Sequence, residues 1–390
     1  MADVSGLRTT ANVATVQRYI DIAPEIMSLE PSATPLTVIT ARMGKEMTGD
    51  AEYHWVQSER AVRFDAINKE GGYETPTTEE LVVDTEGVFA ANQLVTVPRT
   101  AEIMRVKSLK GSSKVEFERG AAGTTKAALL DNEPLFVIAQ VAEEGSTSFE
   151  ARTDNPDKVT NYTQIFKTSI EETGTMGSSL NQTSPHDWVW QHREKNREHL
   201  LDIEHAALFG HKSSGTGPNG KPLRTTGGVL SFYTENNQDA GGTLTESEWE
   251  SWVRALCRYG DEKTVFASPL LLSVVNNFAV GRLEVIQADM DRTYGVKVTK
   301  YICAHGEINL VKHNLLEGAT WGGYGIAVDY KTAPPKFRPL GGGPLGSRDT
   351  KLLPARQEND LDGVQDELLT EAGFQWPQPK TGGVLTGVTG

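Results

Sequence analysis

Two charged, extended stretches constrain the fold of this chain more than any other feature, because neither is suited to stand alone. The first, AEYHWVQSERAVRFDAI (51–67), is rich in β-forming residues with roughly alternating polarity, which predicts an extended hairpin. Arg60, Arg63 and several carboxylates make this hairpin a charged ribbon. The second stretch, STSFEARTDNPDKVTNYTQIF (146–166), has the same character. Since an isolated two-stranded ribbon is only marginally stable in water, we expect the ribbon to lie on another surface.

The segment between these stretches is dense in short strands. From residue 76 to 145, five runs of β-forming residues alternate with turn residues, and KGSS (110–113) fits a hairpin turn between two of them. This density predicts a small β-barrel or sandwich inserted into a larger fold. The predicted strands are LVVDTE, NQLVTVP, EIMRVKSL, SKVEFER and PLFVIAQ.

Residues 184–209 form the clearest helix of the sequence. Ser184 to Asp187 make a capping box with proline at the first helical position. The first half of the helix is polar all round, while Leu200, Ile203 and Ala207 lie on one apolar stripe. We therefore expect a half-packed, half-exposed helix that crosses a surface.

A compact α/β region follows a glycine-rich connector. Thr245 to Glu248 form a second capping box, ahead of a helix that Gly260 closes. The buried face of this helix is predicted to consist of Trp249, Trp252, Val253 and Leu256. A buried helix from Ser268 and several strands complete a domain of about 70 residues. These strands are predicted at 264–268, 295–303, 307–313 and 324–330.

The composition is that of an ordinary soluble fold. The 390 residues suffice for two or three domains, with 38% hydrophobic and 23% charged residues. No run approaches the roughly 18 apolar residues of a membrane span, and the N-terminus lacks the pattern of a secretion signal. Cys257 and Cys303 lie in apolar contexts and are expected to be reduced core residues, which indicates folding in the cytoplasm.

The net charge of −14 bears on nucleic-acid binding. A protein that grips duplex DNA usually carries a basic face, because the release of counterions from the phosphates supplies the affinity. No cluster of lysines and arginines here meets that need. If this protein meets DNA, its charge is suited to avoid sticking to it.

GTGPNGKP (215–222) matches most of a phosphate-binding loop. Such a loop needs a Ser or Thr hydroxyl at its eighth position, a strand before it and a helix after it. Pro222 occupies the eighth position, a helix precedes the loop, and no helix start follows it. The glycine spacing G-x-G-x-x-G, here and at 341–346, lacks the same flanks. A mobile connector is the favoured interpretation, and a nucleotide-binding enzyme that uses Gly215–Lys221 stays as an alternative.

No metal, cofactor or catalytic site is predicted. His192 and His199 share a helix face, but no carboxylate or cysteine converges on them, so we expect solvated histidines. Residues 358–363 resemble the front of a calcium loop, yet Leu369 stands where the bidentate glutamate belongs. A polar strand and turn is favoured there. The motifs G-x-S-x-G, H-E-x-x-H and C-x-x-C do not occur in the sequence.

Taken in order, several segments resemble the major capsid proteins of tailed bacteriophages, in a branch that carries a β-rich insertion. Each segment alone is a weak signal, whereas their order and spacing together are specific. The resemblance runs from about residue 20 to the end and implies the α+β fold of the phage Hong Kong 97 capsid protein. The segments are ATPLTVIT (33–40), TNYTQIF (160–166), DIEHAALFG (202–210), TYGVKV (293–298), GIAVDY (325–330) and QENDLDGVQDELLTEAGFQW (357–376).

The resemblance implies a division of the chain into parts. A long spine helix at 184–210 belongs to the peripheral domain, and the axial domain meets its copies around five- and six-fold axes. The parts are an N-terminal arm (1–44), an extended loop (45–75 and 146–165), a β-rich insertion domain (76–145), a peripheral domain (166–243 and 336–390) and an axial domain (244–335).

The function implied by the resemblance is self-assembly, as pentamers and hexamers, into an icosahedral shell around double-stranded DNA. The expected location is the virion shell, assembled in the host cytoplasm, with no membrane, no cofactor and no specific binding of DNA. Neighbouring copies would hold the ribbon and both ends of the chain. The arm is too short for a cleaved scaffolding segment, so a scaffold would be a separate protein or absent. A portal and a cement protein are further partners. Candidate contacts between subunits are Arg60, Arg63, Glu150 and Arg152.

Three alternatives remain at this point. A nanocompartment shell of the same fold would enclose an enzyme cargo. A nucleotide-binding enzyme would lose activity on substitution of Lys221, whereas a shell protein would still assemble. An outer decoration protein would form a small trimer-like product in place of closed particles.

Overall fold

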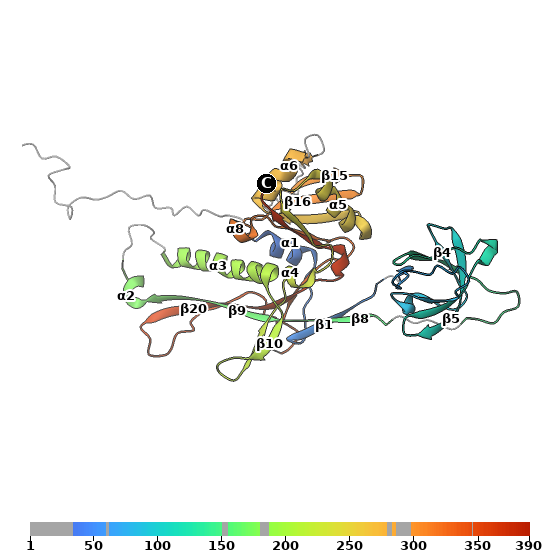
Figure 1. Cartoon of the computed structure of the whole chain (residues 1–390). Coiled ribbons are helices and arrows are strands. Elements are labelled where there is room, and N and C mark those ends of the chain that lie inside the picture. Colours follow the sequence, from blue (N-terminus) through green and yellow to red (C-terminus); the bar gives the residue numbers. More distant parts are fainter. Residues whose placement is uncertain are drawn as a thin grey trace, which may run out of the picture. The chain divides into compact units, whose positions relative to one another are not determined.

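The computed structural model describes residues 34–59, 62–149, 155–179, 187–278, 283–285, 298–344 and 346–390. The chain divides into two compact units (Figure 1). Ser58–Asp157 form one, here called the barrel unit. The described residues up to Gln57, together with Lys158–Gly390, form the other, here called the main unit.

The barrel unit is a closed, all-β structure. Its six strands pair antiparallel in the order β2-β7-β4-β5-β6-β3. An antiparallel bridge between Ile67 and Val83 joins the two outer strands, so the sheet closes on itself and leaves no free edge there. The strands are β2 (Phe64–Ala66), β3 (Glu80–Val82), β4 (Gln93–Val97), β5 (Glu102–Gly111), β6 (Lys114–Glu118) and β7 (Pro134–Gln140).

Alternating side chains fill the interior of the barrel, as the sequence pattern predicts. In β6, for example, Val115 and Phe117 are fully buried between more exposed neighbours. All five strands predicted between 76 and 145 are present. A sixth strand, β2, lies before that range, and it belongs to the barrel because it pairs with β7.

A short ribbon lies at the base of the extended stretches, where β1 (Glu52–Gln57) pairs with β8 (Asp157–Tyr162). The predicted hairpin within 51–67 is therefore wrong, because its two halves pair with other strands. Alternating polarity fixes which face of a strand is buried but not which strand lies beside it. Tyr53 and Trp55 are buried, and the Tyr53 hydroxyl donates to the Phe374 carbonyl at 2.7 Å. The chain itself thus supports this base.

A seven-stranded mixed sheet forms one layer of the main unit. β13 lies near its centre, parallel to β16 and antiparallel to β17. β21, from the end of the chain, lies between β12 and β17, so the last residues complete a sheet whose other strands lie between residues 238 and 328. The order is β12 (Gln238–Gly242), β21 (Gly383–Val388), β17 (Gly325–Val328), β13 (Glu262–Ala267), β16 (Gly306–Lys312), β15 (Val298–Cys303) and β14 (Leu283–Val285).

Two helices, α5 (Glu246–Leu256) and α6 (Pro269–Phe278), contribute to the core beside this sheet. The predicted capping box of α5 is confirmed, since the Glu248 N–H donates to Thr245 Oγ1 at 3.3 Å and the Thr245 N–H donates to Glu248 Oε2 at 2.9 Å. The predicted buried face is confirmed as well. Trp249, Trp252, Val253 and Leu256 are all buried.

A second sheet carries the long helix α3 (Asp187–Phe209). β9 (Gln164–Thr173) pairs antiparallel with β20 (Gly363–Gln375), from Gln164–Ala372 to Thr173–Gly363. β18 (Lys336–Pro339) and β19 (Lys351–Leu353) pair with the other side of β20. Ile203 and Ala207 of α3 are buried against this layer and Leu200 is half-buried, as predicted. Residues 184–186 of the predicted capping box lie outside the described residues.

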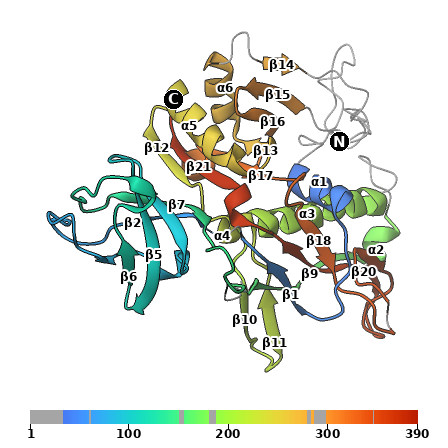
Figure 2. The same cartoon turned by 90° about the vertical axis from the view of Figure 1, so that its right-hand side faces the viewer.

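The remaining elements are short. β10 (Ser213–Thr216) and β11 (Pro222–Thr225) form a separate hairpin that projects from the main unit (Figure 2). α1 (Pro35–Met43) packs against α3 and β18. The other short helices are α2 (Gly174–Gly177), α4 (Val229–Phe232) and α8 (Gly318–Trp321).

Candidate functional site

Only one of the four predicted contact residues, Arg63, lies among the residues that the structure describes. Arg60, Glu150 and Arg152 lie outside the described residues. Arg63 is described and exposed, and its carbonyl accepts the Val137 N–H at 2.8 Å, which ties the backbone just before β2 to the barrel. Only Arg63 can therefore be placed, and the role of the four residues as contacts stays a prediction.

The loop at 215–222 is the turn of the β10–β11 hairpin. The Gly217 N–H donates to the Lys221 carbonyl at 2.8 Å, and Gly220 adopts a left-handed φ of +68°. The next helix, α4, begins only at Val229 and is one turn long. A phosphate-binding loop needs a helix N-terminus directed at the anion, and none follows this turn. The nucleotide-binding interpretation is therefore wrong at residues 215–222.

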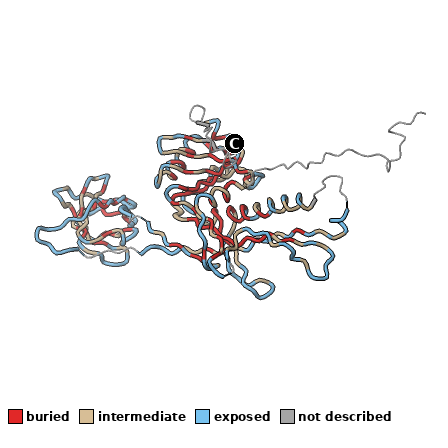
Figure 3. The backbone as a smooth tube through the Cα atoms, turned by 180° about the vertical axis from the view of Figure 1, so that it is seen from behind, coloured by how far each residue is buried: buried red, intermediate tan, exposed pale blue. Residues whose placement is uncertain are grey.

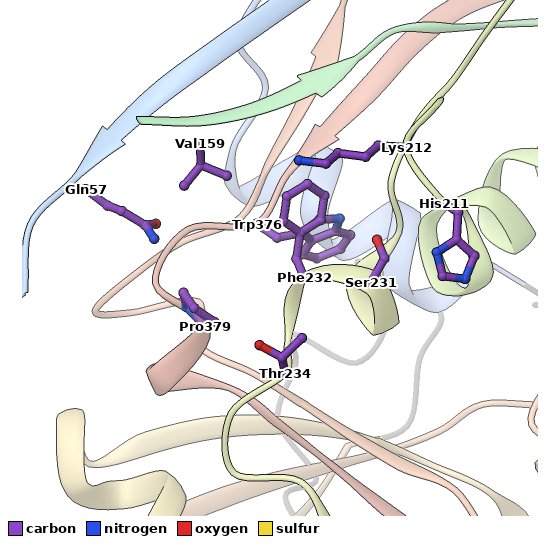
Figure 4. Close-up of a pocket in the computed structure, with 9 residues that line it drawn as sticks. All are labelled: Gln57, Val159, His211, Lys212, Ser231, Phe232, Thr234, Trp376 and Pro379. Carbon is purple, nitrogen blue, oxygen red and sulfur yellow. The ribbon is translucent and has the colours of Figure 1, made fainter. Parts of the chain in front are cut away.

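A cavity of about 380 Å³ lies beside the base of the ribbon (Figure 4). Gln57 of β1 and Val159 of β8 line one part of it, and Phe232 and Trp376 form an aromatic wall. Lys212 Nζ lies 5.7 Å from the centroid of the Phe232 ring and 3.4 Å from the Thr160 carbonyl. The cavity holds no pair of groups arranged for acid–base catalysis.

The two helix histidines are not solvated, and that prediction is wrong. His199 is fully buried between two threonines, with Nδ1 2.9 Å from Thr168 Oγ1 and Nε2 2.8 Å from Thr370 Oγ1. Burial lowers the pKa of His199, although the charge of Asp202 opposes the shift. His192 lies 3.1 Å from Asp366. The helix face that carries them is covered by β9 and β20, which the sequence does not place there.

A buried carboxylate that sequence analysis missed anchors the start of α1. Glu204 of α3 accepts the Leu36 N–H at 2.8 Å and the Thr37 N–H at 2.7 Å. His313 Nε2 lies 2.8 Å from Glu204 Oε1, and the Leu315 N–H donates to His313 Nδ1 at 3.3 Å. Nδ1 therefore accepts, so Nε2 carries the proton and donates to the carboxylate. The only signal in the sequence is a glutamate beside Ile203, inside the apolar half of the helix.

Two buried ion pairs stabilise the interiors of the two units. In the barrel unit, Arg119 and Glu102 have fully buried side chains, and Arg119 Nη2 lies 2.7 Å from Glu102 Oε2. Burial alone would raise the pKa of Glu102, but the Arg119 guanidinium and two backbone N–H groups hold it below its ordinary value. In the main unit, Lys263 and Asp329 form the equivalent pair.

The remaining candidate ligands do not converge. Within the described ranges, no group of three or more His, Cys, Asp or Glu side chains is placed to hold a metal ion. Cys257 and Cys303 are free thiols that pack, half-buried, against the core beside α5, and burial raises the pKa of Cys257 to about 11. None of the helices that the structure describes has the length and apolar content of a membrane span.

Comparison with known proteins decides the family. The SU10 major capsid protein family matches residues 4–389. The chain belongs to this family. It is thus a phage major capsid protein, a structural component of the virion shell, and family membership favours this role over the nanocompartment and enzyme alternatives. The capsid protein is 25% identical over 312 residues to the major capsid protein of Pseudomonas phage PaMx41, which covers 76% of this chain and 73% of that relative.

Solved structures support the fold. The capsid protein matches a chain of the capsid of a native GTA particle with a TM-score of 0.53 and 9% identity, over 98% of this chain and 99% of that one. The capsid of an empty GTA particle matches with a TM-score of 0.51, 9% identity and the same two coverages. At such identities the likeness concerns the fold alone. The mixed α/β architecture is therefore that of phage-type capsid proteins, as the resemblance implies.

Proposed function

We propose that this capsid protein assembles with copies of itself into the closed icosahedral head of a tailed phage, in rings of five and six subunits around a double-stranded DNA genome. The observation that carries the proposal is the match of residues 4–389 to one capsid family, which spans both units. The fold similarity to capsids of assembled particles supports it. Head-to-tail contacts between identical subunits generate such rings wherever the rotation closes.

In this proposal the parts of the chain have separate tasks. The arm (1–44) and the extended loop (45–75 and 146–165) overlap neighbouring subunits, and the insertion (76–145) extends from that loop. The peripheral domain (166–243 and 336–390) contains α3, and the axial domain (244–335) meets its copies at the ring axes. The pairing of β1 with β8 supports a single two-stranded loop. β21 crosses between the two last domains, which favours their moving as one body.

The contacts proposed between copies involve the charged residues of the extended loop. Arg60 and Arg63 on one stretch, with Glu150 and Arg152 on the other, give that loop both signs of charge, suited to a partner that carries the same two signs. A separate scaffolding protein, a portal and a cement protein are further proposed partners. The enclosed DNA is held without specific binding.

Electron microscopy of the purified protein, alone and with a candidate scaffold, tests the proposal. We expect closed particles with five- and six-membered rings. A protein that stays monomeric at high concentration, and that is missing from the shell wall of native virions, would contradict it. Lys221→Ala separates the proposal from a nucleotide-dependent enzyme, because such an enzyme would lose its activity, whereas a shell protein should still form closed particles.

A further inference from the structure

The β10–β11 hairpin is a cationic projection of an acidic protein. Residues 210–234 contain Lys212, Lys221 and Arg224 and no aspartate or glutamate, in a chain of net charge −14. All four residues of β10 are exposed, and Leu223 of β11 is 59% exposed. The projecting hairpin is drawn largely in the pale blue of exposed residues in Figure 3. Neither Lys221 nor Arg224 forms an ion pair with another described residue. The exposed Leu223 and the two cations without an ion pair give the hairpin an apolar group and positive charge that a complementary partner could cover.

The side chains of the hairpin divide between its two faces. The paired ladder ends at Thr216 and Pro222, and one further bond, from the Gly217 N–H to the Lys221 carbonyl, continues its spacing into the bend at Lys221. Successive side chains of a strand point to opposite faces, so Lys221 and Leu223 share one face and Arg224 lies on the other. The face with Lys221 and Leu223 is called the docking face below.

The same molecule carries a matching acidic projection. Residues 357–367, in the β19–β20 loop and the start of β20, contain five carboxylates, and the one cation of that loop, Arg356, lies just before them. Glu358, Asp360 and Asp362 are exposed and form no ion pair with another described residue. Leu361, among them, is 52% exposed. Both surfaces therefore have an exposed leucine, but the charge beside it is negative in the loop and positive on the docking face.

The hairpin and the loop cannot meet within one subunit. Both belong to the main unit, and Figures 1 and 2 show them as separate projections from it. We propose that the docking face of one copy binds the β19–β20 loop of a neighbouring copy, with Lys221 facing the carboxylates and Leu223 packed on Leu361. This contact rests on the proposed self-assembly, and it adds to it a named pair of surfaces. Complementary charge of this kind fixes the register of an interface more than it adds affinity.

Packaged DNA is the competing partner of a cationic hairpin. Phosphates would be met by Lys221 and Arg224 equally, on both faces, and would leave Leu223 without a role. The acidic loop with its exposed Leu361 accounts for both the cation and the leucine of the docking face. A second copy of this chain is therefore the better-matched partner.

Charge reversal tests the contact in particle assembly. Lys221→Glu and the loop variant Glu358→Lys/Asp360→Lys should each lower the yield of closed particles by about tenfold or more, because every copy repeats the repulsive contact. The combination of both should restore the yield to within about threefold of the unmodified protein. Arg224→Glu is the control, since it makes the same charge change on the opposite face, at a half-buried position, and should leave the yield within about twofold.

The outcomes separate the possibilities. Leu223→Ser, which keeps the charge, should also lower the yield, and urea unfolding of each variant checks that the subunit still folds. Normal particle yield for Lys221→Glu would overturn the contact, as would failure of the combined variant to recover. Normal shells with reduced DNA content in both Lys221→Glu and Arg224→Glu would assign the hairpin to DNA. If the unmodified protein forms no particles at all, the proposed function itself fails.

Discussion

At the scale of single residues, Glu204 joins three segments that are far apart in the chain. Its carboxylate receives two N–H groups from the first turn of α1 and a third from His313, with every partner inside the main unit. The free N–H groups of a helix N-terminus attract a negative charge, so α1 helps to offset the burial of this carboxylate. The residue thus fixes the first described helix of the chain onto α3.

We expect Glu204→Ala to reduce the free energy of unfolding by about 3–5 kcal/mol, because it leaves three buried donors without an acceptor. Urea unfolding of the dissociated subunit, followed by tryptophan fluorescence, measures the change. Glu198→Ala on the same helix removes only an exposed pair with Lys195 and should cost less than about 0.5 kcal/mol. Equal midpoints for the two variants would contradict the anchoring role.

His199 gives the main unit a defined response to acid. Its folded pKa is lowered by burial, whereas the unfolded histidine binds a proton below about pH 6.5. Acidification therefore favours the unfolded state, and the free energy of unfolding should fall as the pH drops below about 6.5, by at most about 1.4 kcal/mol per pH unit. His199→Gln should lose this component. Unfolding measured at pH 7.5 and 5.5 for both proteins checks it, and parallel changes would refute it.

Burial of polar residues is the part of this molecule that the sequence predicts least well. Ionisable side chains such as these usually lie on a solvated helix face or at the edge of a sheet. Three of them are nevertheless fully buried here: His199, Glu204 and Lys263. Each is satisfied by a partner that lies more than 60 residues away or on another element, such as Thr370, His313 and Asp329. Local periodicity carries no information on such partners.

At the scale of elements, the sequence predicts correctly those features that depend only on residues close together in the chain. The Thr245–Glu248 capping box and the helix that follows it need only neighbouring residues, and both are confirmed. The predicted hairpin at 51–67 failed because the partner of β1 is β8, a hundred residues later. At 215–222 the sequence argued against a phosphate-binding loop because of Pro222 and the missing helix, but it did not predict the strands β10 and β11 that make this stretch a hairpin turn and not a mobile connector.

The barrel unit offers an element-scale test of buried charge. Arg119→Ala leaves the Glu102 carboxylate buried without its cation, and we expect a loss of about 3–5 kcal/mol in the free energy of local opening of β5 and β6. Hydrogen exchange of the amides in those strands measures it in the full chain. Lys107→Ala, which breaks an exposed pair with Glu79, is the matched control and should cost about 1 kcal/mol or less. Unchanged protection in Arg119→Ala would count against this pair.

At the scale of the whole molecule, the order of the motifs indicates the family, whereas the net charge bears on how the protein meets DNA. The order of weak motifs indicated the capsid family, and the match over 4–389 confirms it. The division into arm, loop and domains stays a proposal, because it concerns contacts between copies that a single chain does not contain. A carboxylate-rich surface is compatible with enclosing DNA provided that the inner wall does not trap it.

We therefore expect the unassembled subunit to bind duplex DNA more weakly than about 10⁻⁴ M at about 150 mM salt, the weak end of non-specific binding. Electrophoretic mobility shift with a random-sequence duplex measures it. Lys126→Glu, an exposed change on the barrel unit, should make no difference. Micromolar affinity, or a map of the shell with a basic inner wall, would show that the negative charge has another purpose.

The pairing of β1 with β8 has a consequence for how such a shell protein can diversify. The chain leaves the main unit along one of these strands and returns along the other. The whole barrel unit is therefore connected to the main unit through two adjacent, paired strands. A foreign domain whose two ends lie close together could replace the barrel as an exchangeable cassette, without any change of register in the sheets that remain. The capsid protein is therefore expected to accept another domain between β1 and β8 while its two sheets keep their strand pairing.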